Sequence, residues 1–265
     1  MSYKLFSFKN VDEQNDDQWA TRSVEGEIKS CETRTLVEIF DKFMSGKKWK
    51  ILEAGCGLGG WVHFLKERGH DVIGLEYEQS VVDRVKQYDP DFPIVKGDIT
   101  DLQYPDNTFG AYVSLGVVEH FEEGPHRPLL EARRVLKPGG LAFVTVPYLS
   151  LFRRLFAHPL RSFYFMIRSL RGKKKYYWEY RYTRKELIKF LEQTGFEIIY
   201  IDIDDYKRDD TRHHIGLYAD FFFLRKRGGE IWELNALGKF ILRIGRVFSP
   251  WLFCSGQHMV ARNIK

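Results

Sequence analysis

A glycine-rich run after a short apolar stretch is the part of this sequence best suited to bind a ligand. The stretch ends at Glu53, and glycines then stand at every second position, at Gly55, Gly57 and Gly59. Glycine permits a sharp turn and lets the backbone approach a ligand that a Cβ would push away. A helix expected from Trp61 would point its free N–H groups into the same turn. The run predicts a nucleotide-type pocket at the carboxyl end of a first β-strand.

A second carboxylate follows the next expected strand, 71–76. Glu76 ends that strand, where a carboxylate can accept hydrogen bonds from both hydroxyls of a ribose. Gly55, Gly57 and Gly60 also satisfy G-x-G-x-x-G, the dinucleotide fingerprint, which is weak evidence by itself. These residues therefore leave two interpretations open: an adenosine-type ligand, or an NAD(P)-dependent oxidoreductase on a Rossmann fold.

A candidate catalytic pair follows the fourth expected strand, 109–116. Histidine is the residue type best suited to remove a proton near neutrality, so His120 is a candidate base, and Glu119 precedes it directly. The alternative is that both residues cap the next helix or only line the pocket.

Several segments, in order over about residues 49–147, resemble the class I S-adenosylmethionine-dependent methyltransferases of the small-molecule and lipid type (methyltransferase type 11-like). They include the E-x-G-x-G-x-G run at 53–59, the Gly-Asp-Ile step at 97–99 and the R-V-L-K-P-G-G segment at 134–140. The NAD(P) interpretation accounts for the glycines and Glu76, but not for Glu53 or the other two segments. The chain is identified as a member of this methyltransferase family.

The resemblance implies S-adenosyl-L-methionine as the cofactor. It implies that Glu53 faces the cofactor's amino group, that Asp98 accepts from the adenine amino group and that the Ile99 N–H donates to the adenine ring. The expected cofactor-binding residues are Glu53, Gly55, Cys56, Gly57, Gly59, Glu76, Tyr77, Asp98, Ile99, Ser114 and Leu115. The expected reaction is methyl transfer, as O-methylation, to a small-molecule or lipid- or saccharide-linked acceptor.

Strands alternate with helical patterns, which predicts an α/β fold. With the resemblance, we expect a Rossmann-like seven-stranded methyltransferase sheet with helices on both faces and an inserted helical cap. One domain is expected over 1–265. Its parts are a helical arm (1–48), a cofactor-binding core (49–147), a basic aromatic cap (148–182) and the C-terminal half of the sheet with a helical insertion (183–265). Thr183 and Glu186 predict a capping box, and 257–262 a final antiparallel edge strand.

The charge is unevenly distributed. The whole chain carries +5, yet 151–185 holds eleven Lys or Arg against one acid, together with ten aromatic residues. Apolar stripes at helical spacing follow Pro159 and recur at 237–244, with arginines beside them. The composition favours an acceptor with both negative charge and ring or apolar surface. Alternatives are single-stranded RNA, an anionic membrane surface, or stripes that simply pack on the domain's own core.

The remaining composition is typical of a cytoplasmic protein, with peripheral membrane association as an open alternative. No stretch approaches the ~20 apolar residues of a membrane-spanning helix, and the first residues lack a signal-peptide pattern. Cys31, Cys56 and Cys254 have no ligand-like spacing. We expect no metal: 209–214 is interpreted as a polar loop, and a divalent ion at Glu119, His120, Glu122 and Glu123 is a minor alternative.

Overall fold

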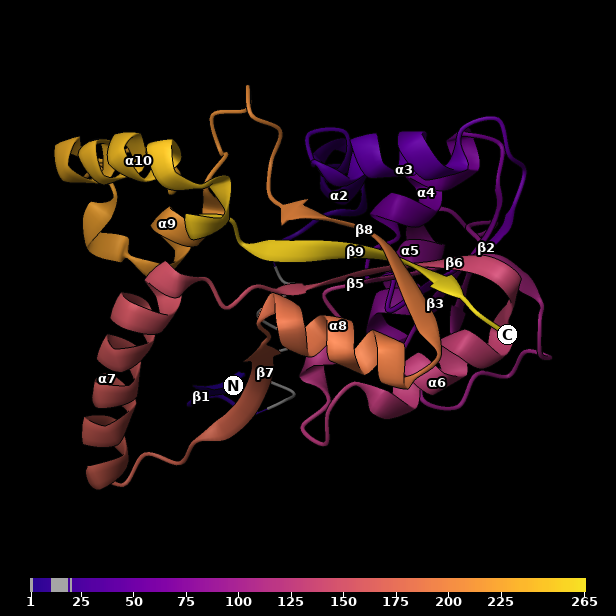
Figure 1. Cartoon of the computed structure of the whole chain (residues 1–265), viewed down its shortest axis with the longest axis horizontal. Helices are drawn as coiled ribbons and strands as arrows, with labels where there is room; N and C mark the ends of the chain where they lie inside the picture. The colour runs from indigo at the N-terminus through magenta and orange to yellow at the C-terminus, as the bar shows by residue number, and fades with distance from the viewer. Residues whose placement is uncertain (1, 11–18, 20) are drawn as a thin grey trace.

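The computed structural model describes residues 2–10, 19 and 21–265. Their main feature is a seven-stranded sheet with the order β4-β3-β2-β5-β6-β9-β8 (Figure 1). The strands are β2 (Lys50–Ala54), β3 (Asp71–Glu76), β4 (Ile94–Lys96), β5 (Phe109–Leu115), β6 (Leu136–Pro147), β8 (Phe196–Asp204) and β9 (Gly256–Asn263).

Strands β2 to β6 are parallel, whereas β9 runs antiparallel to both β6 and β8. Their near-continuous apolar runs are buried because helices cover both faces, as a parallel sheet requires. The predicted fold class is confirmed. One detail differs: β9 lies between β6 and β8, so β8 and not β9 is the edge strand.

Two sets of helices enclose two hydrophobic cores. On one face lie α2 (Val24–Cys31), α3 (Leu36–Met44), α4 (Gly60–Glu67) and α5 (Gln79–Tyr88). On the other face lie α6 (His126–Val135) and α8 (Arg184–Gln193). The predicted capping box begins α8: the Thr183 hydroxyl accepts from the Glu186 N–H, and the Glu186 carboxylate accepts from the Thr183 N–H. The helix α6 ends at Val135, before the Pro138 and Gly139 that were expected to stop it.

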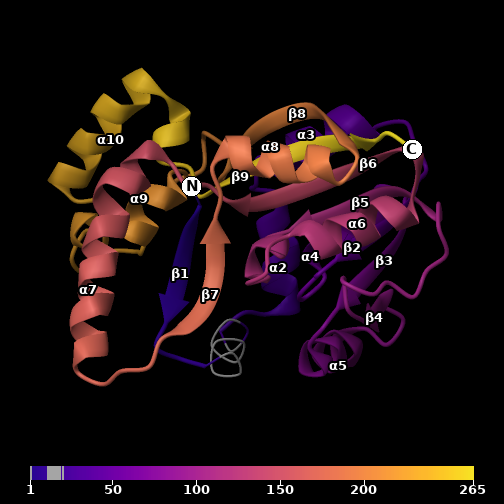
Figure 2. The ribbon, with the colours of Figure 1, turned by 60° about the horizontal axis from the view of Figure 1, so that its bottom comes forward.

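The first residues form a strand where a helix was expected. The strand β1 (Tyr3–Ser7) pairs antiparallel with β7 (Tyr176–Arg181), which lies in the predicted cap segment (Figure 2). Aromatic residues in both segments favour extended backbone, and each strand supplies the other's partner. The cap segment is therefore only partly helical, with the π-helical turn η2 (Arg153–Ala157) and α7 (His158–Leu170) before β7.

A helical insertion between β8 and β9 has a small core of its own. It contains α9 (Ile215–Asp220), η3 (Phe222–Leu224), α10 (Ala236–Phe248) and η4 (Pro250–Leu252). Phe221 separates α9 from η3. Within the part of the chain that the structure describes, no helix has both the length and the apolarity to cross a membrane.

Candidate active site

The glycine turn between β2 and α4 has the conformation that its sequence demands. Gly55, Gly57 and Gly59 have φ values of 79°, 52° and 76°, in the left-handed region. A Cβ on Gly55 would lie 2.5 Å from the Val117 Cγ2, and one on Gly59 would lie 2.6 Å from the Phe92 Cε1. Larger residues would therefore strain the backbone and displace its neighbours.

Glu76 holds this turn against the end of β3. Its Oε2 accepts from the Gly57 N–H at 2.9 Å, and its Oε1 accepts from the Tyr77 and Glu78 N–H groups at 2.8 and 3.0 Å. These donors fix the carboxylate at the wall of a cavity of about 570 Å³.

Glu53 lies beside Glu76 in the same cavity and is almost fully buried. Its Oε2 has no hydrogen-bond partner among the described residues. Burial, and then the Glu76 charge, raise the pKa of the Glu53 carboxyl well above its usual range. A cationic group in the cavity would supply the missing partner.

The cavity brings together most of the predicted cofactor-binding residues: Glu53, Gly55, Cys56, Gly57, Glu76, Tyr77, Asp98, Ile99 and Leu115. Gly59 instead stands at the N-cap of α4, and the Ser114 side chain is fully buried in β5. The Asp98 Oδ1 already accepts from the Thr100 N–H and hydroxyl, at 2.7 and 2.8 Å.

The candidate base His120 lines the same cavity and is the last residue of the short helix η1 (Val118–His120). Its Nδ1 lies 2.8 Å from the carbonyl oxygen of Trp178, on β7. A carbonyl can only accept, so Nδ1 carries the hydrogen of the neutral ring and Nε2 keeps a lone pair. Nε2 can therefore accept a proton.

Glu119 lines a neighbouring cavity of about 560 Å³. This second cavity shares five residues with the first: Arg22, Glu27, Trp61, Leu115 and Gly116. The Glu119 Oε2 is buried without a partner in the described structure. Burial, and then the Glu179 charge, raise the pKa of this carboxyl well above its usual value.

The comparisons with known proteins place this geometry in a family. Residues 52–144 match the family described as a methyltransferase domain. That span contains most of the glycine turn, Glu76, the Gly-Asp-Ile step and His120. The chain carries a class I S-adenosylmethionine-dependent methyltransferase domain.

Curated relatives agree over part of their length. A Mycolicibacterium smegmatis protein named probable S-adenosylmethionine-dependent methyltransferase is 31% identical, over 56% of this chain and 52% of its own. The sterol 24-C-methyltransferase of Yarrowia lipolytica is 30% identical, over 61% of this chain and 42% of its own length. The chloroplastic 2-methyl-6-phytyl-1,4-hydroquinone methyltransferase 1 of Oryza sativa is 46% identical, over 37% and 31%. The chain thus spans about half or less of the length of these relatives.

Solved structures share the fold across nearly the whole chain. A methyltransferase in complex with the Haloferax volcanii Trm112 activator superposes with a TM-score of 0.63, at 17% identity, covering 95% of this chain and 97% of the other. A methyltransferase of Archaeoglobus fulgidus superposes with a TM-score of 0.58 at 15% identity, covering 96% of this chain and 100% of the other. At these identities the likeness concerns the fold alone.

The residues of the methyltransferase domain fit the S-adenosylmethionine that its family and fold imply. The unpaired, buried Glu53 oxygen suits the cofactor's cationic amino group. Glu76, fixed by three backbone N–H groups, suits a ribose hydroxyl. The glycine turn offers a close approach that a Cβ would block.

Sequence reasoning missed residues that reach the cavity from outside the domain core. Trp19, Arg22 and Glu27 come from the N-terminal region, and Tyr177 and Trp178 from β7. The Trp19 indole covers the turn so closely that a Cβ on Gly57 would lie 2.4 Å from its Cη2. No sequence motif identifies these residues, because only the tertiary fold places them at the wall of the cavity.

A buried ionic chain in the second cavity was also missed. The Arg34 Nη2 lies 2.5 Å from the Asp204 Oδ1, and the His258 Nε2 lies 3.4 Å from the same oxygen. Burial acts to raise the pKa of Asp204, but Arg34 and His258 outweigh it and the net shift is downward. Thr145 contacts the His258 Nδ1. The antiparallel insertion of β9 beside β6 creates this arrangement, and the sequence around 204–256 did not predict it.

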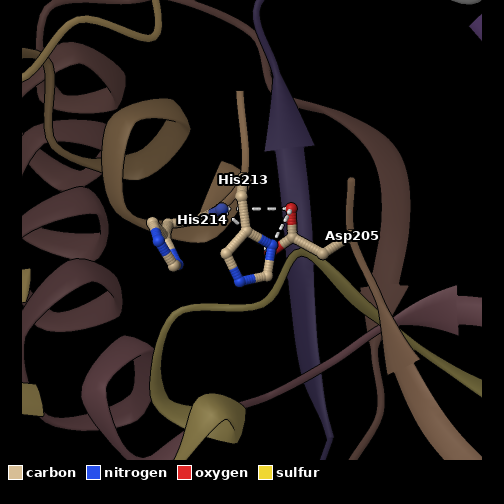
Figure 3. A group of neighbouring side chains, drawn as sticks. All are labelled: Asp205, His213 and His214. Atoms are coloured by element: carbon tan, nitrogen blue, oxygen red, sulfur yellow. Dashed lines mark hydrogen bonds and ion pairs between the residues drawn. The ribbon is translucent and has the colours of Figure 1, made fainter. Parts of the chain in front are cut away.

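Among the described residues, two groups of side chains have metal-ligand chemistry. In the first, Asp205, His213 and His214, the Asp205 carboxylate accepts backbone N–H groups of Tyr206 (2.8 Å) and His214 (3.1 Å) (Figure 3). The His213 Nδ1 lies 2.8 Å from the Tyr206 carbonyl oxygen. Asp205 therefore braces a loop, as the polar-loop interpretation of 209–214 expects. The second group, Glu119, His120 and Glu179, belongs to the two cavities described above.

Proposed function

We propose that the chain transfers a methyl group from S-adenosylmethionine to an oxygen of a small-molecule or lipid- or saccharide-linked acceptor. The observation that carries this proposal is one cavity with two kinds of lining. Glu53 and Glu76 supply the acceptors that the cofactor needs, and His120, Tyr177 and Trp178 border the remaining space.

S-adenosylmethionine supplies a methyl carbon bonded to a cationic sulfur, which is already activated. The protein's task is to align the acceptor oxygen with that carbon and to exclude water. The Trp19 indole over the glycine turn and the β7 aromatic residues serve the second purpose.

His120 takes the proton of the acceptor hydroxyl. The Trp178 carbonyl holds the ring in the tautomer whose Nε2 is unprotonated. As the oxygen–methyl bond forms and the sulfur–methyl bond breaks, the hydroxyl proton passes to Nε2. Burial raises the pKa of Glu119, and its protonated form donates a hydrogen bond to a polar group of the acceptor in the second cavity.

Two features support a ring-bearing acceptor. Tyr177, Trp178 and Phe121 give the first cavity flat apolar walls, whereas the arginines that line the second, Arg22 and Arg34, are paired with Glu27 and Asp204. Two relatives are named for a sterol and a prenylated hydroquinone, which have the same ring-and-apolar character. Since one of these names specifies a carbon, the accepting atom is itself a point to test.

The donor is tested first, by thermal denaturation with S-adenosylhomocysteine and, separately, with NAD. Stabilisation by S-adenosylhomocysteine alone supports the proposal. Stabilisation by NAD alone, or by neither ligand, overturns it in favour of an oxidoreductase or a binding module.

The base is tested with methyl-labelled S-adenosylmethionine and organic and aqueous cell extracts as acceptor sources. His120→Ala should lower kcat by about 10²–10⁴-fold while S-adenosylhomocysteine affinity stays unchanged. His120→Gln, which retains a polar side chain of similar reach, is the steric control. Base-stable label on carbon, with unchanged turnover in His120→Ala, would overturn O-methylation and the role of His120.

A further inference from the structure

The helix α7 packs with one side on β1 of the two-stranded β1–β7 sheet and on Phe8, which follows β1. The Phe165 ring stacks on Phe8, with ring centres 4.4 Å apart. The Arg168 guanidinium lies 5.5 Å from the centre of the Phe8 ring, and the Arg161 Nη2 donates to the Phe6 carbonyl at 3.2 Å. Hydrogen bonds, stacking and cation–π contacts thus define the inner side of α7.

The apolar stripe of α7 lies on the opposite, solvent-facing side. This α7 stripe consists of Leu160, Phe163, Met166 and Leu170, all exposed; Phe163 is 59% and Leu170 82% exposed. A stripe of this kind on a surface helix normally packs on a core. Of the stripe predicted after Pro159, Leu160, Phe163 and Leu170 are exposed and Ile167 is half-buried, so most of that stripe does not pack on the domain's own core.

The helix α10 repeats the arrangement. Ile241 and Leu242 pack on the small core of the insertion, and Gly245 lies against the Phe253 ring. The α10 stripe faces solvent and consists of Leu237, Phe240, Ile244, Val247 and Phe248, of which Val247 is 83% exposed. Figures 1 and 2 both place α7 and α10 at the same end of the molecule.

Positive charge accompanies both stripes without compensating acids. Residues 151–175 contain eight Lys or Arg and no Asp or Glu, and α10 contains Lys239, Arg243 and Arg246 and no acid. One of the eight, Arg153, is buried against Asp220; exposed cations such as Arg154, Arg171 and Lys173 remain. An apolar stripe flanked by Lys and Arg matches an interface with hydrocarbon below and anionic groups above it.

We propose that α7 and α10 dock the protein on the surface of an anionic lipid bilayer. The α7 and α10 stripes enter the boundary between headgroups and acyl chains, and the flanking Lys and Arg side chains contact lipid phosphates. Neither helix crosses the bilayer, so attachment is peripheral and weakens with salt.

Docking would place the second cavity beside the bilayer. Pro147 ends β6 just before the α7 segment, and Gly256 begins β9 just after the α10 segment; both residues line that cavity. A lipid-linked acceptor could then enter without leaving the membrane region. This last step rests on the proposed function, whereas the docking itself does not.

Vesicle flotation without cofactor or acceptor tests the docking. The full chain should bind mixed phosphatidylglycerol–phosphatidylcholine vesicles and bind phosphatidylcholine alone much less. Phe163→Ser with Leu170→Ser, and separately Phe240→Ser with Val247→Ser, should each weaken partitioning at least about tenfold. Arg171→Gln with Lys173→Gln should weaken it by roughly fivefold per charge at low salt.

The matched control is Leu130→Ser with Ile264→Ser, which removes exposed apolar side chains away from α7 and α10. It should bind vesicles like the wild type. All variants should keep their melting temperature and their affinity for S-adenosylhomocysteine, since every altered side chain is exposed.

Wild-type vesicle binding that is absent, or that survives both stripe variants, overturns the proposal. A dimer in light scattering that the stripe variants dissociate, without vesicle binding, assigns the stripes to a second copy of the chain instead. Binding of a single-stranded oligouridine without vesicle binding assigns the basic surface to RNA. Vesicle binding by a protein that transfers no methyl group keeps the docking and rejects the proposed function.

Discussion

The Gly57 N–H and the Glu76 Oε2, 2.9 Å apart, tie the glycine turn after β2 to the end of β3. A carboxylate offers about four acceptor positions, and backbone N–H groups of Gly57, Tyr77 and Glu78 take three of them. The remaining position is on Oε2, beside the one that the Gly57 N–H takes. Glu76 therefore orders the turn, and we propose that this remaining position accepts from a ribose hydroxyl.

Glu76→Ala should abolish the stabilisation by S-adenosylhomocysteine. At a hundredfold excess over Kd the wild type gains about 2.7 kcal/mol, and the variant should gain none. The free protein should also lose about 1–3 kcal/mol, because buried N–H groups lose their acceptor. Thermal denaturation measures both, with Glu67→Ala on the exposed side of α4 as the control. Full stabilisation of the variant would remove Glu76 from the cofactor site.

Cofactor binding should release a proton from Glu53. Burial and the Glu76 charge raise the pKa of this carboxyl, so the free protein keeps the proton to a higher pH than an ordinary glutamate does. A bound ammonium group favours the carboxylate and lowers the pKa again. Affinity for S-adenosylhomocysteine should therefore fall as the pH falls below the raised pKa.

Calorimetric titrations in buffers of different ionisation enthalpy count the protons released. Glu53→Gln should bind more weakly and release fewer protons. Equal proton release by wild type and variant would mean that Glu53 does not meet the amino group.

The glycine turn, β3, β5 and the capping box of α8 could be predicted because their signals are local. An apolar run, a glycine at a positive φ and a Thr with a Glu three residues later each act within one segment. The position of β9 inside the sheet is not local, and neither is the pairing of Tyr3 with Arg181.

For the same reason, periodicity identified the apolar sides of α7 and α10 but not what covers them. A stripe at helical spacing is identical in sequence whether a core, a bilayer or solvent lies against it. Trp19 and His258 reach the cavities only through the tertiary fold, so the sequence around them does not indicate that they line a ligand site.

Asp220→Asn should destabilise the protein by about 3–5 kcal/mol. Asp220 is buried between two arginines, with Arg153 Nε at 2.5 Å and Arg181 Nη1 at 2.9 Å, and so joins α9 to η2 and β7. Burial opposes its ionisation, but both arginines outweigh burial and lower the pKa to about 2. Urea unfolding measures the loss, with the exposed Asp209→Asn as the control.

The pH dependence of the free energy of unfolding gives a second check on the ion pairs that Asp220 forms with Arg153 and Arg181. Because the folded-state pKa is depressed, the stabilisation is present above the ordinary pKa of about 4 and is lost as the pH falls toward 2. Across that pH range, the difference in free energy of unfolding between the wild type and Asp220→Asn should fall toward zero. A constant difference between the two proteins would show that the carboxylate is not ionised in the native state.

Glu119→Gln should stabilise the protein increasingly as the pH rises. The folded state raises the pKa of Glu119 through burial and the Glu179 charge. Folding favours the protonated form of Glu119. Its contribution to the free energy of unfolding is therefore complete below the ordinary pKa of about 4.3 and is lost as the pH rises to the raised pKa of the folded state. Glutamine keeps a neutral side chain of the same shape at every pH. In that window, the free energy of unfolding of the variant should rise relative to that of the wild type by up to about 1.4 kcal/mol for each pH unit.

Urea unfolding from pH 5 to 8, in roughly unit steps, measures this difference, and the exposed Glu123→Gln should show none. Parallel curves for wild type and Glu119→Gln would mean that Glu119 is ionised when buried, and its role as a hydrogen-bond donor to the acceptor would then be wrong.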